Sequence, residues 1–118
     1  MRTVIALLCA LIATSAVAQE VTSTDSATLR GLDKIDGALS DIEIRRGETK
    51  SLGRLLIALE DCRYPTGDPQ ANAYAYLTIV DRYNPDLGFD GWMMASSPAL
   101  NALDHPRYDV WVLRCNTS

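Results

Sequence analysis

Residues 53–64, "GRLLIALEDCRY", carry apolar side chains on both sides of what would be an extended chain. In a strand, successive side chains point to opposite faces. The two faces would hold three apolar residues each: Leu55, Ile57 and Leu59 on one, and Leu56, Ala58 and Cys62 on the other. Apolar groups on both faces are typical of a strand inside a sheet. The stretch therefore predicts a central β-strand, with other strands on either side of it.

Strand-like patterns recur along the chain, separated by short turns. They cover residues 28–36, 39–48, 73–81 and 108–115, together with the short "WMMA" at 92–95. "SSPALNAL" differs, because Ser97 suits a helix N-cap and Pro98 suits the first helical position. We therefore expect a mainly β fold, a small antiparallel β-sandwich or barrel, with one short helix near residues 97–103.

The N-terminus has the form of a secretory signal peptide. Arg2 precedes the apolar run "VIALLCALIA", and "AVA" at 16–18 resembles a cleavage site. We expect residues 1–18 to be this leader and the protein to be periplasmic; an uncleaved N-terminal anchor is the alternative. Residues 19–27, "QEVTSTDSA", are polar and lack periodicity, which predicts a flexible tail. Residues 28–118 would then form a single β domain.

Removing the leader changes both the charge and the cysteine count. The 11 basic residues become 10 against 15 acidic ones, a net charge of −5. An acidic chain without basic clusters argues against nucleic acid and against anionic lipid surfaces. Only Cys62 and Cys115 remain, and in an oxidising compartment they predict one disulfide. One histidine and two distant cysteines have no metal-ligand spacing, so no metal or other cofactor is expected.

Ser96, Ser97 and His105 lie close together in sequence and are the candidate residues for a hydrolase. Both serines lack the GxSxG turn that exposes a nucleophile. Asp104 is adjacent to His105 and is poorly placed to orient its ring. Carboxylate pairs could be drawn from Glu60 with Asp61 or from Asp86 with Asp90, but nothing in the sequence selects either pair. We expect no catalytic residues and no enzyme activity.

The tryptophans and methionines at 92–94 and 111 fit either a core or a surface for a partner. Alternation places Trp92 and Met94 on one face and Met93 on the other, and it places Trp111 opposite Val110 and Val112. Apolar groups on both faces are more than a small domain buries by itself, which favours a protein partner. Trp92, Met93 and Pro98 are the predicted partner-binding residues.

Three stretches resemble a known family: "LRGLDKIDG" at 29–37, "GRLLIALEDCRYP" at 53–65 and above all "GWMMASSPALNALDHPRYDVWVLRC" at 91–115. The chain is similar there to an exported alphaproteobacterial family of unknown function, DUF2155, over roughly residues 28–115. The resemblance implies no catalytic residues. The family's genes tend to lie beside that of a small accessory subunit of respiratory complex I, which implies a related role.

We therefore expect a non-enzymatic periplasmic module that acts in protein interaction or structure. The most specific expectation is an accessory subunit on the periplasmic side of a respiratory membrane complex, above all complex I (NADH:quinone oxidoreductase). It would contact the membrane only through that partner. The alternative is a free-standing module that binds an envelope component or small ligand in a pocket near Trp92 and Trp111.

Overall fold

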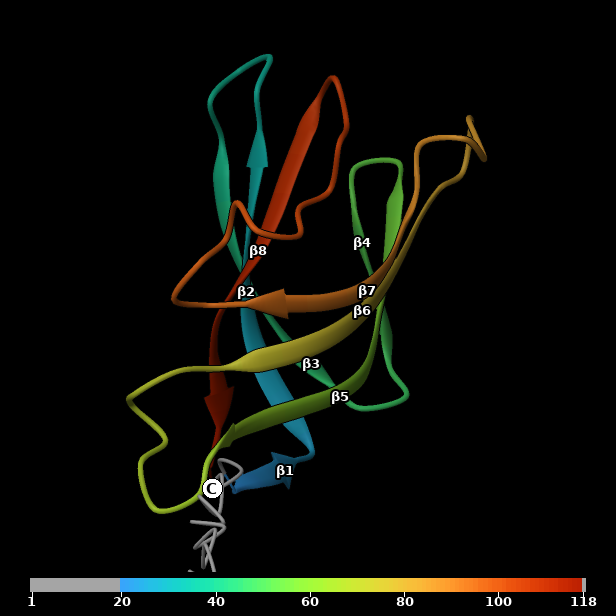
Figure 1. The fold of residues 1–118 in the computed structure, drawn as a ribbon. Coiled ribbons are helices and arrows are strands. Elements are labelled where there is room, and N and C mark those ends of the chain that lie inside the picture. The colour runs from blue at the N-terminus through green and yellow to red at the C-terminus, as the bar shows by residue number, and fades with distance from the viewer. Residues whose placement is uncertain (1–19, 118) are drawn as a thin grey trace, which may run out of the picture.

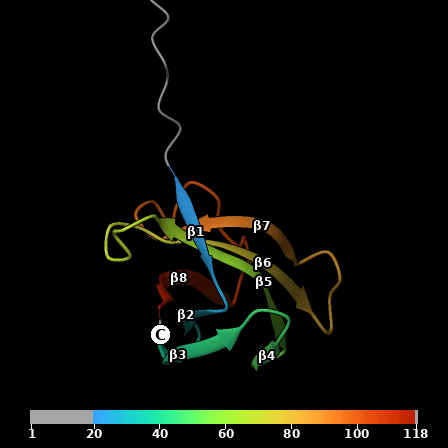
Figure 2. The same ribbon diagram turned by 90° about the horizontal axis from the view of Figure 1, so that it is seen from below.

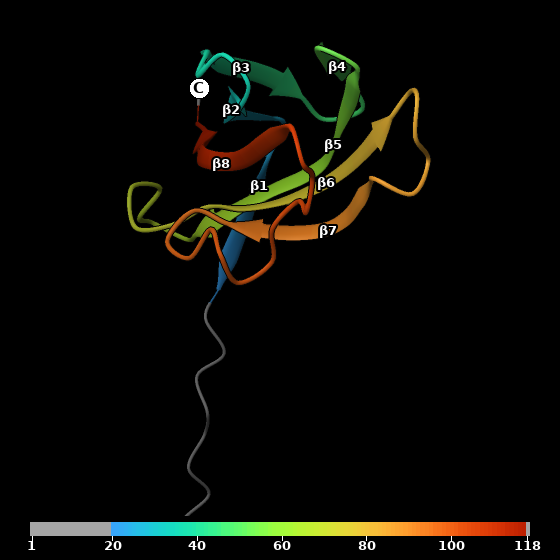
Figure 3. The same ribbon diagram turned by 90° about the horizontal axis from the view of Figure 1, so that it is seen from above.

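The computed structural model describes residues 20–117, which form two antiparallel β-sheets (Figure 1). The strands of this part of the chain are β1 (Val21–Thr24), β2 (Ser26–Asp33), β3 (Leu39–Arg45), β4 (Thr49–Leu52), β5 (Leu55–Pro65), β6 (Tyr74–Asp81), β7 (Phe89–Met94) and β8 (Tyr108–Asn116). The larger sheet has the order β1-β5-β6-β7, with β4 also paired to β5, and the smaller sheet has the order β3-β2-β8. Figures 2 and 3 show the sheets as two layers. The mainly β fold is thus confirmed, as a sandwich.

Strand β5 is the centre of the larger sheet, as its sequence predicted. It pairs with β6 along one side, and with β4 and then β1 along the other. Leu55, Ile57 and Leu59 are fully buried and face the smaller sheet. The other face is less covered, since Leu56 and Ala58 are only half-buried. The placement of Cys62 on that face is wrong: Cys62 is fully buried in the core, because the β-bulge at Glu60 shifts the alternation by one residue.

The core lies between the sheets and is closed by a disulfide. Leu29 and Ile44 of the smaller sheet and Leu77 of β6 have no exposed surface. Cys62 of β5 and Cys115 of β8 form a bond of 2.04 Å with their Cα atoms 5.7 Å apart. The predicted disulfide is confirmed, and it joins one sheet to the other.

The flexible tail predicted at 19–27 is wrong from Val21 onward. Residues Val21–Thr24 form β1, which pairs with β5 so that Thr24 lies opposite Cys62. Ala27, already in β2, is fully buried. Threonine and valine favour extended backbone, and the open edge of β5 supplies hydrogen bonds that the sequence alone does not reveal. The domain therefore begins before Thr28, and the predicted leader lies outside the described residues.

The short helix predicted near 97–103 is also wrong. The segment between β7 and β8 contains turns, one of them closed by the N–H of Leu100 donating to the carbonyl of Ser97 at 3.1 Å. Two helical turns are stable only when packing holds them, and Leu100 is 75% exposed here. Leu103 and His105 are instead buried individually, which holds the segment in an irregular path.

Strand β4 was not predicted, because its residues "TKSL" are mostly polar and exposed. It is held by pairing with β5 across the turn at Gly53. Within residues 20–117, no helix is long and apolar enough to cross a membrane.

Candidate functional site

The outer face of the larger sheet carries a row of large side chains, which we call the aromatic face: Arg63, Tyr74, Tyr76, Trp92 and Met94. They alternate with residues that point into the core, such as Ala75 and Met93. The strand register sets them in two cross-strand rows: Arg63–Tyr74–Met94 and Asp61–Tyr76–Trp92. Figure 1 shows the three strands that carry these rows, β5, β6 and β7, side by side.

Trp92 is the centre of this face and is held in place by its neighbours. Its ring meets the Tyr76 ring edge-on, with centroids 5.3 Å apart and planes at 86°. The Arg63 guanidinium lies over the Trp92 ring, 4.9 Å from its centroid. Arg63 is itself fixed by a 2.7 Å hydrogen bond from Nε to Asp61. Trp92 nevertheless remains 38% exposed, so a fixed aromatic ring is presented to solvent.

The side of the aromatic face away from Arg63 is acidic. The pKa of Tyr76 is raised, first by its hydrogen bond to Asp90, then by burial and by the charges of Asp90 and Glu60. Asp90 lies two residues before Trp92 on β7 and opposite Thr78, in the next cross-strand row. Carboxylates therefore flank the Tyr76–Trp92 pair on the side away from Arg63.

The three predicted partner-binding residues have different positions. Trp92 and Pro98 are exposed, and their role in binding stays a prediction. Met93 is 2% exposed and packs in the core, so its assignment to a binding surface is wrong. Met94 is the methionine on the aromatic face, which the alternation of β7 already indicated. The side chain of Asn101 donates to the carbonyl of Trp92 at 2.9 Å and covers part of the outer edge of β7.

A pocket shared by Trp92 and Trp111 does not exist, because the two rings lie on opposite outer faces of the sandwich. Trp111 on β8 is half-buried beside Arg30, and Arg30 forms an ion pair with Asp41 at 2.8 Å. This position is on the smaller sheet, across the core from Trp92.

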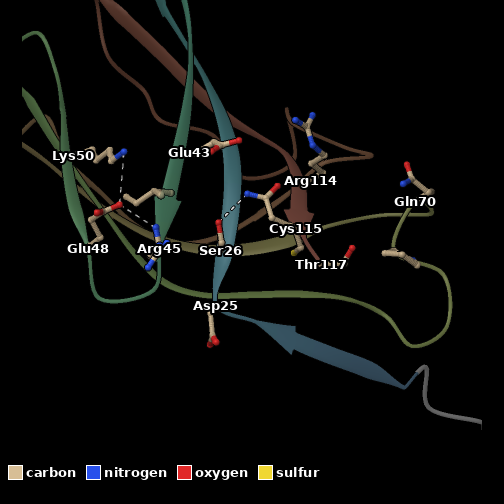
Figure 4. Close-up of a pocket in the computed structure, with 13 residues that line it drawn as sticks. Asp25, Ser26, Glu43, Arg45, Glu48, Lys50, Gln70, Arg114, Cys115 and Thr117 are labelled. Carbon is tan, nitrogen blue, oxygen red and sulfur yellow. Dashed lines mark hydrogen bonds and ion pairs between the residues drawn. The ribbon is translucent and has the colours of Figure 1, made fainter.

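An open groove of about 730 Å³ lies at the ends of β2, β3 and β8 (Figure 4). Its lining mixes acids with bases: Asp25, Glu43 and Glu48 with Arg45, Lys50 and Arg114. Lys50 pairs with Glu48 at 3.8 Å, and Asn116 donates to Ser26 at 2.8 Å. Small-molecule sites are mostly enclosed and apolar, so this groove does not favour the ligand-binding alternative.

His105 is buried, and its contacts differ from those of a catalytic base. Nε2 lies 2.8 Å from Asp81, and Nδ1 accepts the backbone N–H groups of Arg107 and Tyr108 at 3.0 and 3.2 Å. Nδ1 is therefore unprotonated and Nε2 donates to Asp81. Ser96 is engaged elsewhere, with its hydroxyl 2.9 Å from the amide nitrogen of Asn72. The structure joins the histidine to an aspartate but not to a serine.

Asp81 has a structural role that the sequence did not indicate. Burial acts to raise its pKa, but hydrogen bonds from His105 and the backbone N–H groups of Tyr83 and Asn84, with the charge of Arg54, outweigh burial and hold it at about 2. Arg54 donates to it at 2.8 Å. This cluster fastens the β4–β5 turn, the β6–β7 loop and the approach to β8. Its side-chain partners His105 and Arg54 are 24 and 27 residues away in the chain, so no local pattern marks them.

The acidic residues of the two candidate carboxylate pairs make contacts with different partners. Asp61 pairs with Arg63 and Arg46, and Asp90 forms a hydrogen bond with Tyr76 on the aromatic face. Asp86 forms no ion pair with any residue in the range 20–117. In the same range, no group of three or more histidines, cysteines, aspartates or glutamates is placed to hold a metal ion.

Comparison with known proteins identifies the family. Residues 27–115 match the family described as "Uncharacterized protein conserved in bacteria (DUF2155)". "Uncharacterized protein RP359" of Rickettsia prowazekii (strain Madrid E) is 31% identical over 87 residues, which are 71% of this chain and 56% of that protein. The chain thus spans little more than half the length of this curated relative. No solved structure matches. As the resemblance of its three stretches predicted, the chain belongs to the DUF2155 family.

Proposed function

We propose that this protein is a non-enzymatic interaction module that is exported to the periplasm. It docks there as an accessory subunit on the periplasmic side of a respiratory membrane complex, with complex I as the first candidate. The observation that carries the proposal is the aromatic face, a fixed and exposed Trp92 ring among Tyr76, Arg63 and Met94.

The composition of this face supports docking on a protein. Tryptophan, tyrosine, arginine and methionine are enriched at interfaces, and the first three dominate binding energy there. Val80, 46% exposed, extends the same outer face along β6. The contacts of Trp92 with Tyr76 and Arg63 exist before any partner arrives. A surface already ordered loses less side-chain entropy on binding.

A non-enzymatic role is supported by where the reactive side chains lie. The one histidine of the chain has no exposed side-chain surface and uses both ring nitrogens within the fold. A general base must reach a substrate proton, and burial prevents this.

The compartment and the named complex rest on other grounds. The disulfide between Cys62 and Cys115 is of the kind that persists in oxidising compartments, which supports export together with the leader-like residues 1–18. Complex I is the first candidate because of the family's gene neighbourhood.

The test is native extraction from the host. Membranes carrying the protein with a C-terminal tag are solubilised in mild detergent and run on a native gel, and co-migrating proteins are identified by mass spectrometry. We expect complex I subunits, and we expect Trp92→Ala to abolish co-migration. Trp111→Ala, which removes the other tryptophan from the opposite face, is the matched control and should leave it intact. Migration as a single free domain would reject the docking role in favour of a free-standing module.

A further inference from the structure

The two sides of the Tyr76–Trp92 pair are chemically unequal. On one side, in the row of Tyr74 and Met94, Arg63 lies over the Trp92 ring and pairs with Asp61 at 2.7 Å. Asp61 is shared with Arg46, whose guanidinium lies 3.8 Å from it. On the other side, in the row of Thr78, stands Asp90. The protein thus provides its own cation on the first side of the ring pair, whereas the cross-strand row on the second side, Ala58–Thr78–Asp90, contains a carboxylate and no cation.

The carboxylates on that second side are not used for ion pairs within the fold. Glu60 is the extra residue of a β-bulge in β5 and is exposed, and Asp90 is exposed on β7. Neither forms an ion pair with any residue in the 20–117 range. Asp90 forms a hydrogen bond with the Tyr76 hydroxyl, and Glu60 directly precedes Asp61, which lies opposite Tyr76. Both carboxylates are therefore close to the aromatic pair.

Such a surface is complementary to a cation. Aromatic ring faces attract guanidinium and ammonium groups, and neighbouring carboxylates strengthen the attraction. Arg63 shows that the Trp92 ring accepts a guanidinium in this geometry. Without the leader-like residues 1–18, which contain Arg2, the chain carries 10 basic and 15 acidic residues. This net negative charge also favours the approach of a basic partner.

We propose that the aromatic face receives an arginine- or lysine-bearing segment of a partner protein, whose cation lies against Tyr76 and Trp92 and pairs with Glu60 and Asp90. The inference rests on the proposed docking function and specifies its chemistry. The partner's cation takes the position that mirrors Arg63 across the ring pair. Its binding is weakened by salt, because the pairs are exposed.

The probe is the peptide Arg-Gly-Arg-Gly-Arg, with a second peptide in which neutral citrulline replaces each arginine. The full chain is expressed with its leader, purified from the exported fraction with its disulfide formed, and titrated by NMR at low salt. Its two indole N–H signals report on opposite faces, so Trp111 is an internal reference for Trp92. We expect the arginine peptide to shift the Trp92 signal alone and the citrulline peptide to shift neither.

Paired variants test the carboxylates. Glu60→Gln combined with Asp90→Asn should weaken binding of the arginine peptide about fivefold, which is the combined effect of losing two exposed ion pairs. Glu43→Gln, an exposed glutamate on the outer face of the smaller sheet, should not change it. The inference is overturned if neither signal moves, if both move together, if citrulline binds as well, or if Glu43→Gln weakens binding equally.

The same variants separate this inference from the docking function. One outcome is that Trp92→Ala abolishes co-migration with the membrane complex while Glu60→Gln with Asp90→Asn leaves it intact. In that case the aromatic face is the docking surface, and the proposal that its partner is basic is refuted. If no complex co-migrates with the unaltered protein, the docking function fails, and the peptide titration alone decides whether the face prefers a cation.

Discussion

The disulfide between β5 and β8 gives the sharpest prediction about stability. Cys62 and Cys115 are 53 residues apart in the chain and are both buried. The chain-entropy relation for a loop of this length gives a loss of about 14 cal/mol/K in the unfolded state, or about 4 kcal/mol at 25 °C. Total stability of such domains is about 5–15 kcal/mol, so the crosslink supplies a large share.

We therefore expect the paired change Cys62→Ala and Cys115→Ala to lower the free energy of unfolding by about 4 kcal/mol. For a domain of roughly 100 residues this corresponds to a fall in Tm of about 20 °C. Urea titration followed by circular dichroism measures the first quantity, and calorimetry measures the second. Alanine is chosen over serine because serine would place two hydroxyls in an apolar site.

The reduced but unaltered protein is the control, because it loses the crosslink and keeps both sulfur atoms. The free energies of unfolding of the reduced protein and of the double alanine variant should agree to within about 1–2 kcal/mol, which is the stability that packing of the two sulfur atoms contributes. A loss below about 1 kcal/mol in both forms would refute the reasoning, since it would mean that packing between the sheets restrains the chain without the bond.

Three further outcomes follow from the structure. Met93→Ala should cost about 2–5 kcal/mol of unfolding free energy by leaving a cavity, whereas Trp92→Ala should cost less, and equal losses in urea titrations would contradict their opposite placement. The pKa of Asp81 is lowered to about 2 from 3.8, so its stabilising effect is complete above about pH 4 and is lost as the pH falls toward 2; Asp81→Asn should flatten that acid limb of the stability curve. Gly53→Ala should lower Tm, because Gly53 has a φ of 56° and an added Cβ would meet the Tyr108 hydroxyl.

In the strands that the sequence predicted correctly, the apolar residues of the strand itself are enough to indicate an extended, buried segment. β5, β6 and β8 carry apolar residues at many positions and on both faces, which is typical of buried strands whatever their neighbours are. The disulfide was also predictable, because only two cysteines remain outside the leader-like segment.

The predictions that failed concern segments whose conformation depends on contacts with distant residues. The segment 97–103 has good local helix signals, but Leu103 packs in the core while Leu100 is exposed, and the Asn101 side chain donates to the Trp92 carbonyl. Strands β1 and β4 have weak patterns and exist because the two ends of β5 offer open backbone edges. In these places contacts with distant residues outweigh local preference.

The candidate site divides in the same way. The sequence by itself determined that Trp92 and Met94 share a face, because alternation along one strand fixes it. Only the tertiary structure decided that this face is the outer one, that it lies beside Arg63 and Tyr76, and that Trp111 lies on the opposite side of the sandwich. Strand periodicity is set by covalent geometry and is readable in the chain, whereas strand order and register come from the burial of one shared core, to which every strand contributes.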